Sequence, residues 1–358
     1  MSNLIGNRFR VLVFGQSHAP SIGAVIEGLP AGFAPDWDAV SAFMARRAPG
    51  GSALSTARRE ADAPEILSGL NERGETCGAP LAMRIVNGDA RSRDYEKLRD
   101  VPRPGHADYP AGVKFAGYND IRGGGQFSGR LTAPLCFAGA LAMQLLAREG
   151  VRVRAHIAQI ENVFDAPMDF AKPNLDAIAA EGLPVVDSAA GARMERAILQ
   201  AKAEGDSVGG VIECFAAGLP AGLGEPMFDG VENRLARALW GIPAVRGVEF
   251  GAGFAAAGMR GSAHNDAYRV EDGRVVTQTN RHGGILGGIT TGMPIIVRAA
   301  IKPTPSIAKT QESVSLSRNE NETLTVDGRH DPCIVPRAVP CVEAVVAMAL
   351  YDLLLERS

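Results

Sequence analysis

Cysteine is scarce in this chain of 358 residues, which has five scattered thiols: Cys77, Cys136, Cys214, Cys333 and Cys341. The number is odd and no two form a Cys-x-x-Cys pair, so neither a metal site nor a disulfide framework is predicted. No basic leader followed by an apolar run opens the chain, and its apolar segments carry charges or are too short to span a bilayer. We therefore expect a cytoplasmic protein with no membrane partner.

The chain also lacks a large excess of either charge. It has 37 Lys and Arg residues and 40 Asp and Glu residues, which give a formal net charge of -3. Such a chain has no global attraction for nucleic acid, so phosphate binding would depend on local arginine clusters. An RNA-binding patch around the RGGG motif is an alternative. It is disfavoured by the acidic balance and by the absence of repeated RGG motifs with interleaved aromatics.

The most informative stretch is 103–133, where RPGHADYP is followed by RGGGQFSGRLTA. The three glycines at 123–125 allow positive φ and leave room for a ligand close to the backbone. A helix is predicted over Thr132–Arg148, with Pro134 tolerated in its first turn. Its N-terminus, with Arg130 beside it, suits a phosphate or carboxylate. A plain connecting turn is the alternative.

A second helix is predicted over Asp36–Arg47, with Asp36 as its cap and Pro49-Gly50 after it. Arg46 and Arg47 would then lie at its C-terminus, where they either complement the helix dipole or bind a ligand. The following run STARREADAPEIL, with Arg58 and Arg59, is typical of a solvated face.

The two halves of the chain echo one another in order. Ser21–Glu27 and the GLPAGF that follows recur as Ser207–Glu213 and GLPAGL. A helix follows each copy, from Asp36 in the first and over Phe228–Trp240 in the second, and each half closes on a long apolar helix. We expect one domain over 1–358, with repeated halves at about 1–150 and 205–358 and a surface insertion at 151–204.

The closing helices are apolar nearly all round, so they must be covered on several sides. The expected fold class is therefore α+β: an internally duplicated sandwich with helices packed between mostly antiparallel sheets. A doubly wound dinucleotide-binding fold is disfavoured, because strands and helices do not alternate regularly. The polar segment 309–328 is expected to be a mobile loop that could act as a lid.

Three of the six histidines lie in loops with glycine, proline or arginine neighbours: His18, His106 and His330. A histidine near its ordinary pKa can give or accept a proton at neutral pH. Each alone would fit a structural role. Together with Asp331, Arg329 and Arg337 they predict a site that holds an anion and moves protons, although Asp331 could instead cap the turn at Pro332.

These motifs, in this order, resemble the chorismate synthase family over nearly the whole length. The matching segments are GxSH, RPGHADY, RGGG with SxRxTA, EGDSxG, PAGLGEP, GGILGGI, KPTxS and GRHDPC ending in RAVP. The resemblance implies elimination of phosphate from 5-enolpyruvylshikimate 3-phosphate to give chorismate, in the shikimate pathway of aromatic amino acid biosynthesis. It also implies dependence on reduced FMN without net redox change, and a homotetramer.

The resemblance also implies roles for individual residues. His18 would protonate the departing phosphate, His106 would lie by the reduced flavin, and Asp331 would relay the proton from C6. The substrate-binding residues it implies are Ser17, Arg47, Ser128, Arg130 and Arg337. The flavin-binding residues it implies are Gln126, Phe127, Ser128, Ala244, Gly287, Lys302, Pro303, Thr304, Pro305, Ser306 and Arg329.

The chain departs from the common family pattern at several positions, which are Gln16, Ala19, Ala48, Ala53, Gln126, Phe127, Gly129 and Pro243. Fewer cations therefore line one side of the expected site, where the flavin phosphate and a nicotinamide would bind. NADPH is a candidate reductant of the flavin, but a separate flavin reductase is favoured. A flavin-dependent redox enzyme on the same scaffold is the alternative function.

Overall fold

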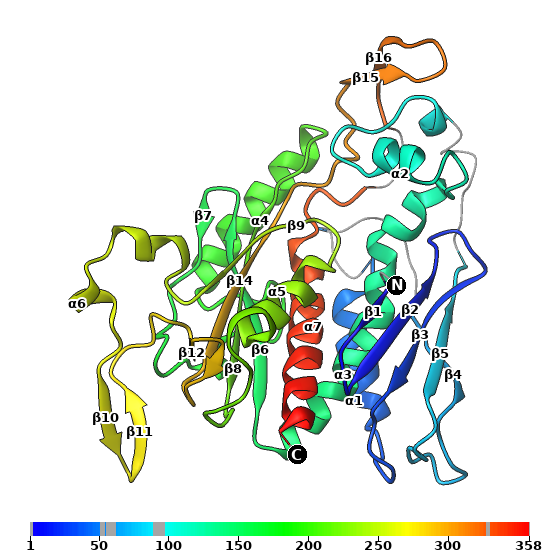
Figure 1. Cartoon of the computed structure of the whole chain (residues 1–358). Coiled ribbons are helices and arrows are strands. Elements are labelled where there is room, and N and C mark those ends of the chain that lie inside the picture. Colours follow the sequence, from blue (N-terminus) through cyan, green and yellow to red (C-terminus); the bar gives the residue numbers. More distant parts are fainter. Residues whose placement is uncertain (1–2, 51–53, 55–61, 89–96, 327–329, 358) are drawn as a thin grey trace.

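Two five-stranded antiparallel sheets enclose a central layer of helices in the computed structural model, which describes residues 3–50, 54, 62–88, 97–326 and 330–357 (Figure 1). The first sheet has the order β1-β2-β3-β5-β4, with bounds Leu4–Ile5, Arg10–Gly15, Ser21–Glu27, Leu81–Val86 and Glu65–Ser68. The second has the order β7-β6-β8-β14-β9, with bounds Val163–Phe164, Arg152–Ile160, Gly210–Ala217, Ile295–Ile301 and Val245–Phe250. This arrangement confirms the predicted α+β fold class.

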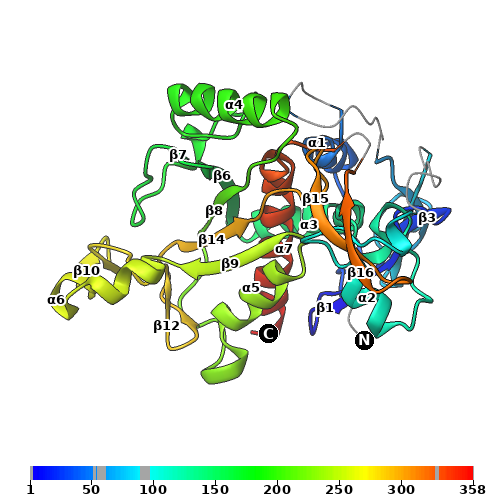
Figure 2. The same ribbon diagram turned by 90° about the horizontal axis from the view of Figure 1, so that it is seen from above.

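The helices between the sheets are α1 (Trp37–Arg47), α3 (Thr132–Arg148), α5 (Val231–Trp240) and α7 (Val335–Glu356). Figure 2, seen from above, shows α7 between the two sheets and α4 (Ser188–Ala203) on the outside of the molecule. The bounds of α3 agree with the prediction. Helix α1 begins after Asp36, whose carboxylate accepts a hydrogen bond from the Ala39 amide at 3.0 Å, as predicted for a cap.

The smaller elements lie at the edges of this layered body. They are α2 (Asp108–Lys114), α6 (Gly261–His264), β10 (Tyr268–Glu271), β11 (Arg274–Thr277), β12 (Ile285–Leu286), β13 (Ile289–Thr290), β15 (Gln311–Ser315) and β16 (Glu320–Leu324). The hairpin β10-β11 and helix α6 form an arm that projects beyond the second sheet (Figures 1 and 2).

Helix α7 forms the centre of the hydrophobic core, and every residue from 338 to 353 is buried. Two of its three acidic residues, Glu343 and Asp352, are buried and paired. Glu343 binds Arg46 at 2.6 Å, and Asp352 binds Arg234 at 2.5 Å and accepts from the Phe9 amide. By length and composition alone, both α7 and the segment Gly129–Arg148 could cross a bilayer, although α7 carries Arg337, Glu343 and Asp352. Their extensive burial is typical of core helices.

Four strands of each sheet follow the same order when they are numbered by their position along each half of the chain. In the first half the order is β2-β3-β5-β4, with α1 between β3 and β4 and α3 after β5. In the second half the order is β6-β8-β14-β9, with α5 between β8 and β9 and α7 after β14. This shared topology supports the proposal that the chain is an internal duplication.

Three sequence predictions differ from the structure. Segment 151–204 begins with β6, an inner strand of the second sheet, so its first ten residues are not a surface insertion. Segment 309–328 contains the hairpin β15-β16, so it is not an unstructured loop. A hydrogen bond of 2.8 Å from Ser315 Oγ to Asp100 attaches this hairpin to the rest of the protein. Helix α5 begins at Val231 rather than Phe228, because Gly230 has extended backbone there.

Candidate active site

A cavity of about 690 Å³ opens where α3 and α7 begin, between the two sheets. Its volume lies within the range of about 300–1,000 Å³ that is usual for small-molecule and cofactor sites. The positive ends of both helix dipoles are directed towards it, which favours an anion. The side chains that line it include Arg47, Arg103, His106, Ser128, Arg130, Asp331 and Arg337.

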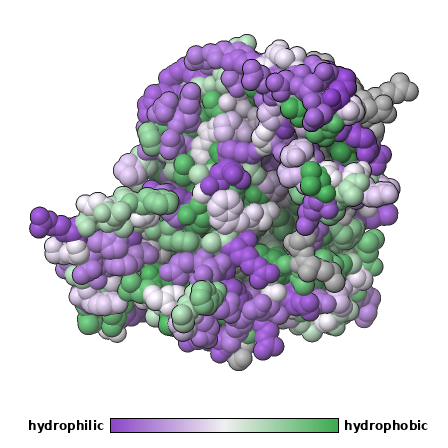
Figure 3. Space-filling model, turned by 45° about the horizontal axis from the view of Figure 1, so that its top comes forward, coloured by the Kyte–Doolittle hydropathy of each residue, from purple (hydrophilic) through white to green (hydrophobic). Residues whose placement is uncertain are grey.

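Basic side chains dominate the lining of this cavity. Among the described residues the Lys and Arg side chains are Arg47, Arg103, Arg130, Arg246, Lys302 and Arg337, while Asp331 is the one carboxylate. Apolar residues such as Phe127, Trp240 and Ile242 form other parts of the wall. Figure 3, turned so that the upper side comes forward, shows hydrophilic and hydrophobic residues intermixed over this face. The cavity therefore suits a ligand that carries several negative charges and a flat apolar part.

The triple-glycine loop packs against two histidines: His106, which lines the cavity, and His18, which lies behind the loop. Gly123, Gly124 and Gly125 have φ of 60°, 84° and 56°, as predicted. A Cβ at Gly123 would lie 2.7 Å from His18 Nε2, and one at Gly124 would lie 3.1 Å from His106 Nε2. Glycine is thus needed both for the backbone conformation and for the approach of the two imidazoles.

His106 is held by a buried carboxylate and an arginine. Its Nδ1 lies 2.5 Å from Asp108 Oδ1, and Arg103 Nε donates to Asp108 Oδ2 at 2.7 Å. Burial alone would raise the pKa of Asp108, but hydrogen bonds from Arg103 and His106 hold it well below its ordinary value. Arg103 Nη2 also lies 3.1 Å from the same Nδ1, so the Nδ1 edge of the ring is held by Asp108 and Arg103. Nε2 is the ring nitrogen that faces Gly124.

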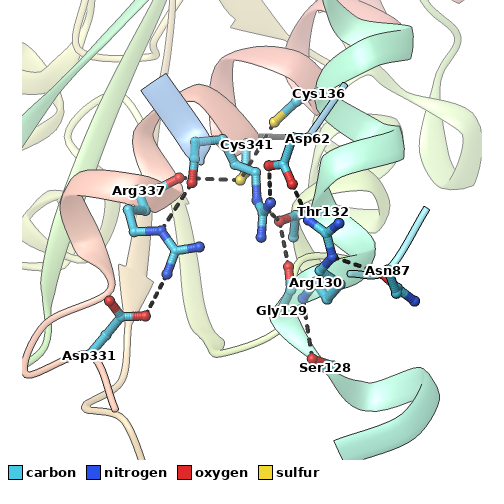
Figure 4. A network of polar contacts seen from close by, with 11 residues as sticks. Asp62, Asn87, Ser128, Gly129, Arg130, Thr132, Cys136, Asp331, Arg337 and Cys341 are labelled. Carbon is cyan, nitrogen blue, oxygen red and sulfur yellow. Dashed lines mark hydrogen bonds and ion pairs between the residues drawn. The ribbon is translucent and has the colours of Figure 1, made fainter. Parts of the chain in front are cut away.

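Asp62 joins the two arginines that the resemblance assigns to the substrate (Figure 4). Its carboxylate is fully buried and accepts hydrogen bonds from Arg47 Nη1 through one oxygen and from Arg130 Nη1 through the other. Burial lowers the pKa of Arg47, but the charge and hydrogen bond of Asp62, together with the nearby Cys341 and Cys136, outweigh it, so the pKa is raised and the guanidinium stays protonated. Asn87 Oδ1 also accepts from Arg130 Nε at 3.1 Å.

Asp331 and Arg337 form a second pair on the α7 side of the cavity. Arg337 Nη1 lies 2.5 Å from Asp331 Oδ2, and Arg337 Nε donates to the carbonyl of Arg47 at 3.0 Å. Burial and the nearby Arg47 lower the pKa of Arg337, which Asp331 partly offsets. This guanidinium is therefore in an environment where an additional negative charge would be favourable.

The structure brings most of the predicted site residues to this cavity. Those that line it are His106, Asp331, Arg47, Ser128, Arg130, Arg337, Gln126, Phe127, Ala244, Lys302, Thr304, Pro305 and Ser306. Ser17 and His18 lie behind the glycine loop, where the Ser17 amide donates to the carbonyl of Gly125 at 3.1 Å.

Two predicted flavin residues do not line the cavity. Gly287 is exposed on the turn between β12 and β13, because the GGILGG segment forms a hairpin there instead of approaching the α3 and α7 ends. Pro303 faces a separate cavity of about 420 Å³ beside Ser207. Arg329 lies outside the described residues, as do Arg58 and Arg59 of the run expected to be a solvated face.

Sequence reasoning missed two carboxylates that organise the site, Asp62 and Asp108. Asp62 belongs to the run STARREADAPEIL, yet it is 3% exposed, so that interpretation was wrong for this residue. Asp108 could have been found from its spacing, because a carboxylate two residues after His106 is within reach of the same ring. No local pattern marks Asp62, whose partners are 15 and 68 positions away.

The fold is α+β, and its cavity has the cationic lining and the titratable side chains that are typical of an enzyme with a small anionic ligand. Comparison with known families agrees with this class and narrows it. Residues 9–355 match the family described as chorismate synthase, and the chain belongs to that family. It is accordingly an enzyme of the lyase class.

Curated relatives named chorismate synthase match the chain over almost its full length. The protein of Korarchaeum cryptofilum is 49% identical over 352 residues, covering 98% of this chain and 96% of its own. The protein of Thermococcus kodakarensis is 48% identical, with 96% and 95% covered. A crystal structure of chorismate synthase superposes with a TM-score of 0.78 at 29% identity, covering 98% of this chain and 93% of that one.

Proposed function

We propose that this chain converts 5-enolpyruvylshikimate 3-phosphate to chorismate and phosphate by a 1,4-anti elimination that depends on reduced FMN. The single observation that carries the proposal is the convergence of His106, Asp331 and several arginines on one cavity at the N-termini of α3 and α7. The reaction removes a proton from C6 and breaks the bond from C3 to the phosphate oxygen. The electrons of the C–H bond form the new double bond, so the reaction has no net redox change.

The arginines supply the binding energy for the charged groups of the substrate. Arg47, Arg130 and Arg337 present guanidinium groups to the cavity from α1, the start of α3 and α7. Guanidinium binds phosphate and carboxylate through paired hydrogen bonds, and burial strengthens these bonds. Ser128 lines the same side, while Ser17, behind Gly123, would support the loop at the phosphate. Asp62 fixes the relative position of Arg47 and Arg130.

The proton transfers are assigned to three residues. His18, next to Gly123, would protonate the departing phosphate, which leaves more readily as a monoanion. Asp331 would end the relay that removes the proton from C6, and Arg337, whose Nη1 lies 2.5 Å from Asp331 Oδ2, would hold it in position. His106 would exchange a proton through Nε2, with its ring oriented by Asp108.

Several other residues that line the cavity fit a flavin. Phe127, Ala244 and Pro305 offer apolar surface for a ring system, and Lys302 and Ser306 offer donors for its polar atoms. Gln126, Ser128 and Thr304 complete this set. When bound, reduced FMN supplies transient electron density that makes loss of phosphate from the allylic system feasible.

The remaining inferences concern supply and assembly. We infer that an external flavin reductase supplies reduced FMN and that NADPH serves as the primary reductant. A homotetramer follows from the family resemblance, and exposed aromatic residues such as Phe228 and Phe254, each 87% exposed, are of the kind that association covers. The free cysteines among the described residues are consistent with a cytoplasmic location.

A flavin-dependent redox enzyme is the competing function, and an anaerobic assay separates the two. We expect the purified chain, given chemically reduced FMN, to release phosphate from 5-enolpyruvylshikimate 3-phosphate. NADPH alone should give little release. His106→Ala and Asp331→Asn should lower kcat by about 10²–10⁴ while changing FMN affinity little, because proton transfer acts at the barrier. Nicotinamide oxidation without phosphate release would favour the redox enzyme and refute the elimination.

A further inference from the structure

Cys341 in the cavity wall faces a second thiol, Cys136, and the proposed reaction uses neither of them. Cys136 Sγ on α3 lies 3.7 Å from Cys341 Sγ on α7, and both are free (Figure 4). Cys341 also donates to the carbonyl of Arg337 at 3.4 Å. A contact between two reduced sulfur atoms inside a cationic cavity calls for a chemical explanation.

The backbones of α3 and α7 are very close at this point. A Cβ built on Gly139 would lie 2.4 Å from Ala344 Cα. Gly139 and Ala344 each follow a cysteine by three positions, so each shares a helix face with its cysteine. The glycine contact therefore holds the two sulfur atoms together. A disulfide would require the 3.7 Å between the two sulfur atoms to shorten to about 2.05 Å.

The two thiols are chemically unequal. Cys136 is completely buried, and burial raises its pKa well above the ordinary value for a thiol. Cys341 lines the cavity, and the hydrogen bond that Cys136 donates, together with the charge of Arg47, lowers its pKa despite burial. Thr132 and Arg337 act in the same direction. Because Cys341 lines the cavity and Cys136 does not, Cys341 is the thiol placed to react, as the thiolate, with a reagent in the cavity.

We propose that Cys341 is a modification site for hydrogen peroxide and that Cys136 is its resolving thiol. The Cys341 thiolate attacks one peroxide oxygen; a sulfur–oxygen bond forms, the O–O bond breaks, and hydroxide leaves as water after taking a proton. The Cys136 sulfur then attacks the Cys341 sulfenic acid. The sulfur–sulfur bond forms as the second water leaves. In total, two thiols are oxidised and one peroxide is reduced to two waters.

The first test uses the wild-type chain and its own cysteines as controls. The reduced protein is treated with limiting hydrogen peroxide, blocked with N-ethylmaleimide and mapped by mass spectrometry without reduction. We expect a linkage between Cys136 and Cys341 to form before the exposed Cys77 reacts. Cys333, whose pKa burial raises to about 12, should remain a thiol. Oxidation of Cys77 first, or no linkage, would overturn the proposal.

Variants separate the roles of the two thiols. In Cys136→Ala the reaction should stop at the sulfenic acid of Cys341, trapped by dimedone, and in Cys341→Ala Cys136 should stay reduced. Cys214→Ala, a buried thiol of β8 outside the pair, is the matched control and should leave the linkage unchanged. Dimedone labelling of Cys136 in Cys341→Ala would contradict the assigned roles.

The cationic surroundings of Cys341 are tested with alkylating probes that differ in charge. We expect the rate ratio of iodoacetate to iodoacetamide to be about tenfold higher at Cys341 than at Cys77, because fixed cations concentrate the anionic reagent. Inorganic phosphate should slow the iodoacetate reaction at Cys341 but leave Cys77 unaffected. Equal ratios at the two thiols would show that the cavity does not activate Cys341, and the proposal would fail.

Discussion

Replacing Asp62 with asparagine tests how the cavity keeps two arginines in place. Asp62 is 0% exposed at its side chain, and its partners Arg47 and Arg130 are 4% and 6% exposed. The substitution preserves shape but leaves two buried cations without their shared anion. Removal of one partner of a buried ion pair costs about 3–5 kcal/mol. Because both arginines border the cavity and can regain water there, we expect about 3 kcal/mol, the lower end of that range.

That loss has a measurable thermal signature. At an unfolding entropy of about 2.1 cal/mol/K per residue, a chain of 358 residues would melt about 4 °C lower. Inorganic phosphate should raise the melting temperature of Asp62→Asn more than that of the wild type, because it replaces the lost counter-charge. Differential scanning fluorimetry with a phosphate titration measures both effects.

The matched control is Asp176→Asn, which removes a carboxylate paired with Arg152. The Asp176 side chain is 76% exposed and that of Arg152 is 57% exposed. An exposed pair of this kind contributes little, so no shift in melting temperature is expected. Should Asp62→Asn melt like the wild type and respond to phosphate no more strongly, the role given to Asp62 would be wrong.

Three further predictions follow from packing and titration. Gly139→Ala should lower the free energy of unfolding by about 1–3 kcal/mol or more in chemical denaturation, because the new Cβ would clash with Ala344. Its control is Gly112→Ala, where a Cβ would have no neighbour within 4 Å, so the free energy of unfolding should not fall. Asp108→Asn should lower kcat with little change in KM, and an unchanged kcat would contradict the orienting role of Asp108. The third concerns His156. Burial lowers its pKa, but hydrogen bonds with Asp165 and Glu213 raise the pKa overall. The stability that protonated His156 gives the folded protein should therefore be fully present below about pH 6.5 and be lost as the pH rises through the raised pKa. His156→Gln should flatten that part of the stability–pH curve, and an unaltered slope would refute the assignment.

Local signals were sufficient for the elements with strong boundaries. Helix α3 was predicted at its observed bounds because a long apolar run starts after the RLT segment and ends before Gly150. Asp36 marked the start of α1 for the same kind of reason. The start of α5 was missed because Gly230 interrupts an otherwise continuous pattern. The hairpin β15-β16 was missed because its polar sequence is stabilised by contact with Asp100, far away in the chain.

The same distinction between local signals and tertiary contacts applies to the candidate site. His106, Arg130 and Asp331 lie in motifs that point to ligand binding, and all three line the cavity. The residues that hold them were less visible. Asp62 reaches Arg47 and Arg130 only through tertiary structure, and the contact between Cys136 and Cys341 spans 205 positions. Spacing in the sequence contains no information about such contacts until the helices are packed.

The central claim is that the cavity catalyses an elimination in which the flavin is not consumed. The most direct measurement is the anaerobic ratio of chorismate formed to FMN oxidised, with substrate in large excess over reduced FMN. The account predicts many molecules of chorismate and an equal number of phosphate ions per flavin, with the flavin still reduced at the end. One oxidised flavin for each product, or flavin oxidation without phosphate release, would contradict it.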